Sequence, residues 1–231
     1  MMRPISSLSS SVTEILTIPV SVLVVDTCSV LDVTRSLYRA EAPTRSLGMG
    51  RTAVQVSAEK PPKLHIIVFD EIEQELQRNL HEEMVRLRTQ MTKLSEAGNV
   101  SLWFLSAFWW RRSVRRVESI LAGFPETWRW AGHRISVEMA CIPLARARLA
   151  AGIKPGKRGS ANLGDCLITE QLLELATQLR NAGFSRDIIF VSSNSKDYGG
   201  PILKSPLDSQ FSSLEIDFYR DIEGAMTQLG Y

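Results

Sequence analysis

Cysteine and long apolar runs are scarce in this sequence, and each absence excludes a class of protein. The three cysteines lie far apart and form no metal-type pair: Cys28, Cys141 and Cys166. An odd count without close spacing predicts reduced thiols and a cytoplasmic location rather than a disulfide framework. The longest apolar stretch, near residues 100–110, is well short of the roughly 18 residues that a membrane helix requires. We therefore expect no membrane partner.

Histidine is equally scarce, with only His65, His81 and His133 in the chain. None adjoins the strand-end acids described below, although His65 and His81 flank one acidic segment at a distance. A Ser–His catalytic pair and a zinc site with two histidine ligands are therefore disfavoured.

The composition is otherwise that of an ordinary globular protein. Of its 231 residues, 44% are hydrophobic and 23% are charged, which suits one well-buried domain with an insertion. Residues 1–18 carry several serines and Glu14 but no signal-peptide pattern, so we predict a loose tail there. A single domain is predicted over residues 19–231, with a helical, basic insertion over about residues 80–160.

Three continuous apolar runs predict strands buried on both faces, as in a parallel sheet. They span residues 20–25, 64–69 and 188–191, and residues 214–218 form a shorter alternating strand. Apolar residues at helical spacing follow Asp70 and Asp165, and residues 41–63 have the prolines and glycines typical of a loop. The predicted fold is an α/β protein with three layers, α/β/α, around a mainly parallel sheet.

Acidic residues occur at the junctions between these predicted strands and the segments that follow them. Asp26 ends the first strand, acids from Asp70 to Glu75 follow the second, and Asp197 lies after the third. Ligands of open α/β sheets bind beyond the carboxyl ends of the strands. Oxygen ligands without histidine or cysteine suit Mg²⁺ or Mn²⁺. Helix capping is the simpler explanation for each acid taken alone.

Asp165 has an additional feature. It precedes Ile168 and Leu172 by three and seven residues, so it lies on the apolar face of its helix. A carboxylate on a buried face is costly without a partner, and a metal ion is one such partner.

Basic residues are concentrated in the middle of the chain. The candidates for contacts with a polyanion are Arg111, Arg112, Arg115, Arg116, Lys154, Lys157 and Arg158. Tryptophans lie near the arginines and could stack on bases, although core packing explains such aromatics as well. A basic run can also be a solvated face, so the pattern alone leaves both interpretations open.

Four short motifs, in this order, resemble those of a PIN domain. They are Asp26-Thr27-Cys28-Ser29 after a strand, Glu75-Leu76 early in a helix, Gly164-Asp165-Cys166-Leu167-Ile168, and Ser192-Ser193-Asn194-Ser195-Lys196-Asp197-Tyr198 after a strand. The sequence is most similar to the larger stand-alone PIN-like proteins, which have a helical insert and a basic loop before the Gly-Asp helix. The resemblance covers about residues 20–229, with the insert matched only loosely.

The resemblance implies a pocket lined by Asp26, Glu75, Asp165 and Asp197. In it, Asp26, Asp165 and Asp197 would hold one or two Mg²⁺ or Mn²⁺ ions, and Glu75 would bind or orient the attacking water. Glu71 or Asp70 would replace Glu75 if the register shifted by one turn.

Two neighbours are supporting residues by the same resemblance, Ser29 and Asn194. The family often has Asp where Asn194 stands and Asn where Cys28 stands, so two further ligands would be missing.

The function expected from these features is a metal-dependent endoribonuclease that hydrolyses RNA, single-stranded or structured. A non-catalytic nucleic-acid-binding or scaffold protein on the same fold is the alternative from another class. A toxin ribonuclease restrained by an inhibitory protein partner is a third. The sequence leaves open the RNA target, RNA versus DNA, and whether the chain forms a homo-oligomer.

Overall fold

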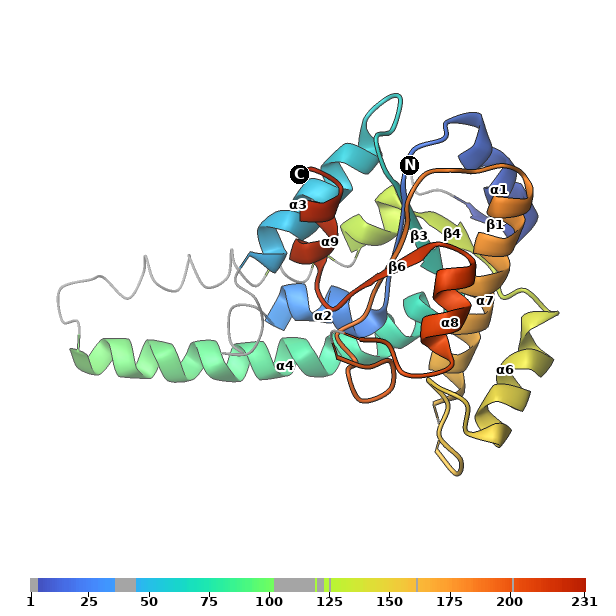
Figure 1. Cartoon of the computed structure of the whole chain (residues 1–231). Helices are drawn as coiled ribbons and strands as arrows, with labels where there is room; N and C mark the ends of the chain where they lie inside the picture. Colours follow the sequence, from blue (N-terminus) through green and yellow to red (C-terminus); the bar gives the residue numbers. More distant parts are fainter. Residues whose placement is uncertain are drawn as a thin grey trace.

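Six parallel strands form the central sheet of the computed structural model (Figure 1). They are β1 (Ile5–Ser6), β2 (Val22–Val25), β3 (His65–Phe69), β4 (His133–Ile135), β5 (Ile188–Val191) and β6 (Ile216–Tyr219). Their order across the sheet is β1-β4-β3-β2-β5-β6. The structure describes residues 4–35, 45–101, 119, 123–124, 126–160, 162–200 and 202–231.

Helices cover both faces of this sheet, which confirms the predicted three-layer α/β/α fold. They are α1 (Leu8–Thr17), α2 (Thr27–Arg35), α3 (Ser46–Ala58), α4 (Asp70–Ser101), α6 (Cys141–Ala151), α7 (Leu163–Asn181), α8 (Leu207–Ser213) and α9 (Ile222–Gln228). One core packs α1, α7 and α8 on the sheet, and the other packs α2, α3 and α9 on its opposite face.

The central strand β2 shows why the apolar runs are continuous. Val22 and Val24 point into the first core, whereas Leu23 and Val25 point into the second. Successive side chains of a strand face opposite sides of the sheet, so covering both sides requires an apolar residue at every position. The bounds predicted for β5 are those observed, and those of β2 and β3 agree to within two residues.

The prediction of a loose tail over residues 1–18 was wrong. Strand β1 extends the sheet beside β4, and α1 buries Leu8, Val12 and Ile15. These three residues recur at spacings of four and three, which is one face of a helix. The Ser7 hydroxyl accepts a hydrogen bond from the Ser10 N–H at 3.2 Å and caps α1. The serines that suggested a tail include this cap.

Two further expectations need correction. Residues 46–58, expected to lie in a loop, form α3. Its Gly50 lies under Phe124, where an added Cβ would be 2.7 Å from a ring carbon, so this glycine permits close packing and does not break the helix. The insertion over residues 80–160 is not wholly helical, because β4 lies within it and pairs with both β1 and β3. A strand of three residues has too few positions to show a period.

A buried hydrogen-bond chain joins α1 to the amino ends of β3 and β4. His65 Nε2 lies 2.8 Å from the Ile18 carbonyl, and His65 Nδ1 lies 2.9 Å from His133 Nε2. His133 Nδ1 in turn lies 3.4 Å from Glu14 Oε2. Both imidazoles are buried, so their hydrogen bonds contribute directly to holding α1 on the sheet.

The Ile18 carbonyl can only accept a hydrogen bond, so His65 Nε2 carries a proton and donates it. His65 Nδ1 and His133 Nε2 then share one further proton, and one of these two nitrogens is its donor.

We predict that His133→Leu lowers the free energy of unfolding by about 1–3 kcal/mol, because it leaves a buried His65 nitrogen without its partner. Urea denaturation measures the change. His81→Leu is the matched control, since His81 is exposed on α4 and should shift stability by less than about 0.5 kcal/mol. Equal losses in the two variants would contradict a structural role for the chain.

Candidate metal centre

Asp26 follows β2 directly, at the carboxyl edge of the sheet, and both of its carboxylate oxygens accept hydrogen bonds. The Thr27 N–H donates to Oδ1 at 2.8 Å, and the Ser192 hydroxyl donates to Oδ2 at 2.8 Å. Ser192 follows β5, which pairs with β2 up to Val25 and Val191, so the register places it beside Asp26. With 1% of its surface exposed, Asp26 is held in one orientation.

Two more carboxylates meet Asp26 at this edge. Glu75 comes from the second turn of α4, and Asp165 comes from the first turn of α7. One oxygen from each of Asp26, Glu75 and Asp165 lies within 4.8 Å of the other two. The Thr27 hydroxyl donates to Glu75 Oε2 at 3.0 Å, so Thr27 contacts two members of this group. We call Asp26, Glu75 and Asp165 the carboxylate triad.

Burial and mutual repulsion shift the protonation of the triad. Loss of hydration raises the pKa of Asp26 to about 7, against the favourable hydrogen bond from Ser192. Loss of hydration and then the charges of Asp26, Glu75 and Asp197 raise the pKa of Asp165 to about 8. Both shifts disfavour the charged forms, and a bound cation would reverse them.

The choice between Glu71 and Glu75, which the sequence left open, is decided by their neighbours. Glu71 Oε2 accepts a hydrogen bond from Gln171 Nε2 at 2.8 Å, so its carboxylate is bound to the side of α7. Glu73 is buried in ion pairs with Arg129 and Arg134. Glu75 is the α4 glutamate that lies with Asp26 and Asp165.

Asp197 flanks the triad. Its Oδ2 accepts from Asn194 Nδ2 at 3.0 Å, and its Oδ1 lies 3.9 Å from Lys154 Nζ. Its charge is close enough to raise the pKa of Asp165. The set of carboxylates within 4.8 Å nevertheless contains Glu75 rather than Asp197, so the sequence-based ligand set and the observed group share two members.

The two supporting residues from the sequence join the loops around the site. The Ser29 hydroxyl accepts from the Ser193 N–H at 2.8 Å and so ties α2 to the turn after β5. Asn194 fixes Asp197 through its side chain, and its N–H donates to the Ser192 hydroxyl at 3.2 Å. Both act on the orientation of the acids.

Sequence reasoning did not single out three polar residues that hold the acids: Thr27, Ser192 and Asn162. The sequence did contain a signal for Ser192. It comes directly after β5, just as Asp26 comes directly after β2, and these two strands pair up to Val191 and Val25. A hydrogen bond from Asn162 lowers the pKa of Asp165, and no strand end or helical period marks that residue.

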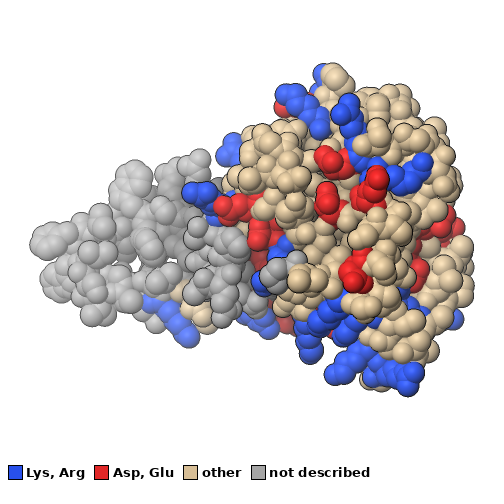
Figure 2. All heavy atoms as spheres, viewed as in Figure 1, with Lys and Arg blue, Asp and Glu red and all other residues tan. Residues whose placement is uncertain are grey.

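The basic candidates divide into two sets. Arg111, Arg112, Arg115 and Arg116 lie outside the residues that the structure describes. Lys157 and Arg158 are exposed in the loop between α6 and α7, and Lys154 in the same loop is partly buried beside Asp197. Figure 2 shows basic side chains along the lower edge of this face, around the place of this loop in Figure 1 and below the acidic residues.

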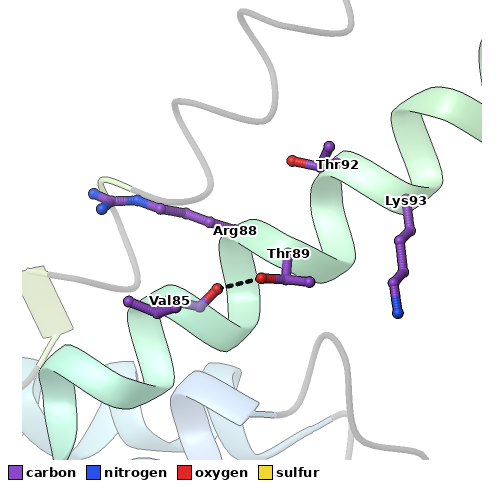
Figure 3. Close-up of a pocket in the computed structure, with 5 residues that line it drawn as sticks. All are labelled: Val85, Arg88, Thr89, Thr92 and Lys93. Atoms are coloured by element: carbon purple, nitrogen blue, oxygen red, sulfur yellow. Dashed lines mark hydrogen bonds between the residues drawn. The ribbon is translucent and has the colours of Figure 1, made fainter.

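A separate hollow of about 430 Å³ lies along α4 (Figure 3). Val85, Arg88, Thr89, Thr92 and Lys93 line it, and the Thr89 hydroxyl donates to the Val85 carbonyl at 2.9 Å. It begins ten residues after Glu75 on the helix, about 15 Å at 1.5 Å per residue. None of the described residues that line it is a carboxylate, so they offer no metal ligand of the kind found in the triad.

Within the described part of the chain, no helix combines the length and apolarity needed to cross a membrane. Comparison of the chain with family models, with curated proteins and with solved structures found no match. The function is therefore argued from the carboxylate triad itself.

The raised pKa values predict a pH-dependent stability. Asp26 and Asp165 bind more protons in the folded than in the unfolded chain between about pH 4 and pH 8, so their contribution to stability is present at low pH and is lost as pH rises through 7–8. Mn²⁺ should therefore raise the melting temperature more at pH 8 than at pH 6, relative to EDTA.

Thermal melting of wild type and Asp165→Asn checks this. The variant keeps the side-chain shape but cannot ionise, so in EDTA its stability relative to wild type should increase from pH 5 to pH 8. About 2–4 °C is expected for each kcal/mol gained in a protein of this size. Parallel pH profiles for the two proteins would show that Asp165 titrates normally.

Proposed function

We propose that the protein is a metal-dependent endoribonuclease. The observation that carries the proposal is the convergence of Asp26, Glu75 and Asp165 at the carboxyl edge of a parallel sheet. Ligand sites of open α/β folds lie at this edge. The motifs that supply these acids also resemble those of PIN-like nucleases, and this resemblance favours RNA as the substrate.

The donor set fits Mg²⁺ or Mn²⁺. The triad offers only carboxylate oxygens, the ligands that hard divalent cations prefer. Two of the three acids have raised pKa values because burial removes their hydration and neighbouring carboxylates repel them. When bound, such an ion supplies Lewis-acid stabilisation of a phosphodiester and lowers the pKa of a water molecule.

The protein's own residues prepare this chemistry. Thr27 fixes Asp26 through its N–H and Glu75 through its hydroxyl, so one residue sets the relative orientation of two ligands. Ser192 holds the second oxygen of Asp26. Glu75 is the acid suited to accept a proton from water, because the hydrogen bond from Thr27 engages only its Oε2, whereas both oxygens of Asp26 accept hydrogen bonds. Fixed geometry of this kind avoids reorganisation when substrate binds.

The proposal predicts Mn²⁺-dependent cleavage of a labelled single-stranded RNA by the full chain. Asp165→Asn and Glu75→Gln should each lower the rate about 100-fold or more, since loss of roughly 3 kcal/mol of stabilisation has that effect. Glu71→Gln is the matched control. It lies one turn earlier on α4 but binds Gln171, so cleavage should persist.

Three other outcomes would be informative. Equal losses in all three variants would indicate a general loss of folding and not the loss of metal ligands. Cleavage that survives in EDTA would refute a metal mechanism. RNA binding without cleavage in any divalent ion would favour the nucleic-acid-binding or scaffold alternative.

The arginines near the middle of the chain remain candidates for binding RNA. Replacing Arg115 and Arg116 together by Ala should weaken RNA binding and lower the slope of log affinity against log salt concentration by about 1.4, at about 0.7 per phosphate contact. Filter binding at several salt concentrations measures both quantities. An unchanged slope would assign these arginines to a solvated face, and Lys157→Ala with Arg158→Ala tests the loop separately.

A further inference from the structure

Lys154 brings a fixed positive charge to the border of the carboxylate triad. Its ammonium lies 3.9 Å from Asp197 Oδ1, while the other oxygen of Asp197 accepts a hydrogen bond from Asn194. Both charged side chains are largely buried, with 27% of Lys154 and 15% of Asp197 exposed. A pair shielded in this way is screened by salt less than a surface pair.

The main chain of Lys154 is anchored from beneath by a buried arginine. Arg148 Nη1 donates to the Lys154 carbonyl at 2.6 Å, and its Nε and Nη2 donate to Glu170 at 2.6 Å and to Gln210 at 3.1 Å. Arg148 therefore ties α6, α7 and α8 to the loop that carries Lys154.

A second anchor comes from the other end of the same loop. Asn162 Nδ2 donates to the Pro155 carbonyl at 2.9 Å, and Asn162 also contacts Asp165. Gly156 packs so tightly that an added Cβ would lie 2.8 Å from the Ile153 carbonyl oxygen. The loop is thus packed and hydrogen-bonded on both sides of Lys154, which fixes the main chain from which its side chain reaches Asp197.

The charges divide into two groups. Asp26, Glu75 and Asp165 lie within 4.8 Å of one another and lack a basic partner among the ion pairs of the described residues. Asp197 is near enough to act on Asp165 but already has Lys154. In two-metal sites the ions lie about 3.5–4 Å apart and share carboxylates between them. A second ion next to Asp197 would have to compete with the ammonium of Lys154, which extends from an anchored loop.

We propose that Lys154 takes the place of a second metal ion. The triad then binds one divalent cation, and Lys154 neutralises Asp197 at the position where a two-metal nuclease would hold the other. This inference rests on the proposed metal site and specifies its stoichiometry. The site then has two positive charges, an exchangeable divalent ion at the triad and the permanent ammonium of Lys154.

The test is titration of the full chain with Mn²⁺, with free Mn²⁺ followed by electron paramagnetic resonance. Wild type should bind one ion. Lys154→Met should bind a second, weaker ion, because Asp197 is released from its partner. Lys157→Met is the matched control from the same loop, exposed and outside the pair, and should bind one ion.

A double variant links the second ion to Asp197. Lys154→Met combined with Asp197→Asn should return to one ion, and Lys154→Arg, which keeps the charge, should also bind one. The cleavage rate should also depend on the positive charge beside Asp197. Lys154→Met should lose about tenfold in rate at low Mn²⁺ and recover at high Mn²⁺. Thermal melting of each variant confirms that it is folded.

The outcomes separate this inference from the proposed function. Two ions in wild type, or one ion in folded Lys154→Met, would overturn the role of Lys154 and leave the metal site intact. A second ion that persists in the double variant would also overturn it. No bound ion in wild type would overturn the proposed function and this inference with it.

Discussion

Repulsion among carboxylates that share one poorly hydrated edge of the sheet is the constraint on which the site depends. Charged groups removed from water lose hydration, and like charges within a few ångströms add to the cost. The triad exists because rigid elements hold it: a register-fixed pair of strands places Asp26 beside Ser192, and the first turns of α4 and α7 bring the other two acids. The sheet, buried on both faces, supplies the rigidity.

The polar residues around the acids orient the carboxylates and do not neutralise their charge. Thr27, Ser192 and Asn194 contribute hydroxyl and amide groups, which direct carboxylate oxygens without cancelling their charge. Cationic side chains pair with other acids: Lys154 lies beside Asp197 at the border of the triad, and Arg134 of β4 pairs with Glu73 of α4. A cluster of acids arranged in this way keeps its negative charge uncompensated, which lowers stability, as functional sites often do.

Much of the fold could be predicted from local pattern, and the limits of that prediction have physical reasons. Continuous apolar runs predicted β2, β3 and β5 because both faces of the sheet are covered, and Gly183 ends α7 with a local pattern of the same kind. There the Gly183 N–H donates to the Arg180 carbonyl and the Phe184 N–H to the Leu179 carbonyl, with Gly183 in the left-handed region at φ 82°. Strand β1 and strand β4 are two and three residues long and are defined only by pairing with each other and with β3. No local pattern carries that information.

The candidate site likewise has residues that the sequence could identify and residues that only tertiary contacts identify. Asp26 and Asp165 could be identified because a strand end and a helix face are visible in the sequence. Whether Glu71 or Glu75 joins them depends on what Gln171 and Thr27 bind, contacts that span 100 and 48 residues. The position of Lys154 depends on Arg148 in the preceding helix and on a loop packed around Gly156. Residue type suggests the chemistry, and the tertiary contacts select which members of a type take part.

The pairing of β1 with β4 has a consequence for the making of the protein. Ser6 donates to the carbonyl of Arg134, which is synthesised 128 residues later. At about 5–20 residues per second, β1 waits roughly 6–26 s on the ribosome for its neighbour. Helix α1 waits longer, since the face formed by Leu8, Val12 and Ile15 packs in one core with α7. This segment is made before its partners and is thus among the last to be placed, and during that interval its apolar face is open to chaperones and to other nascent chains.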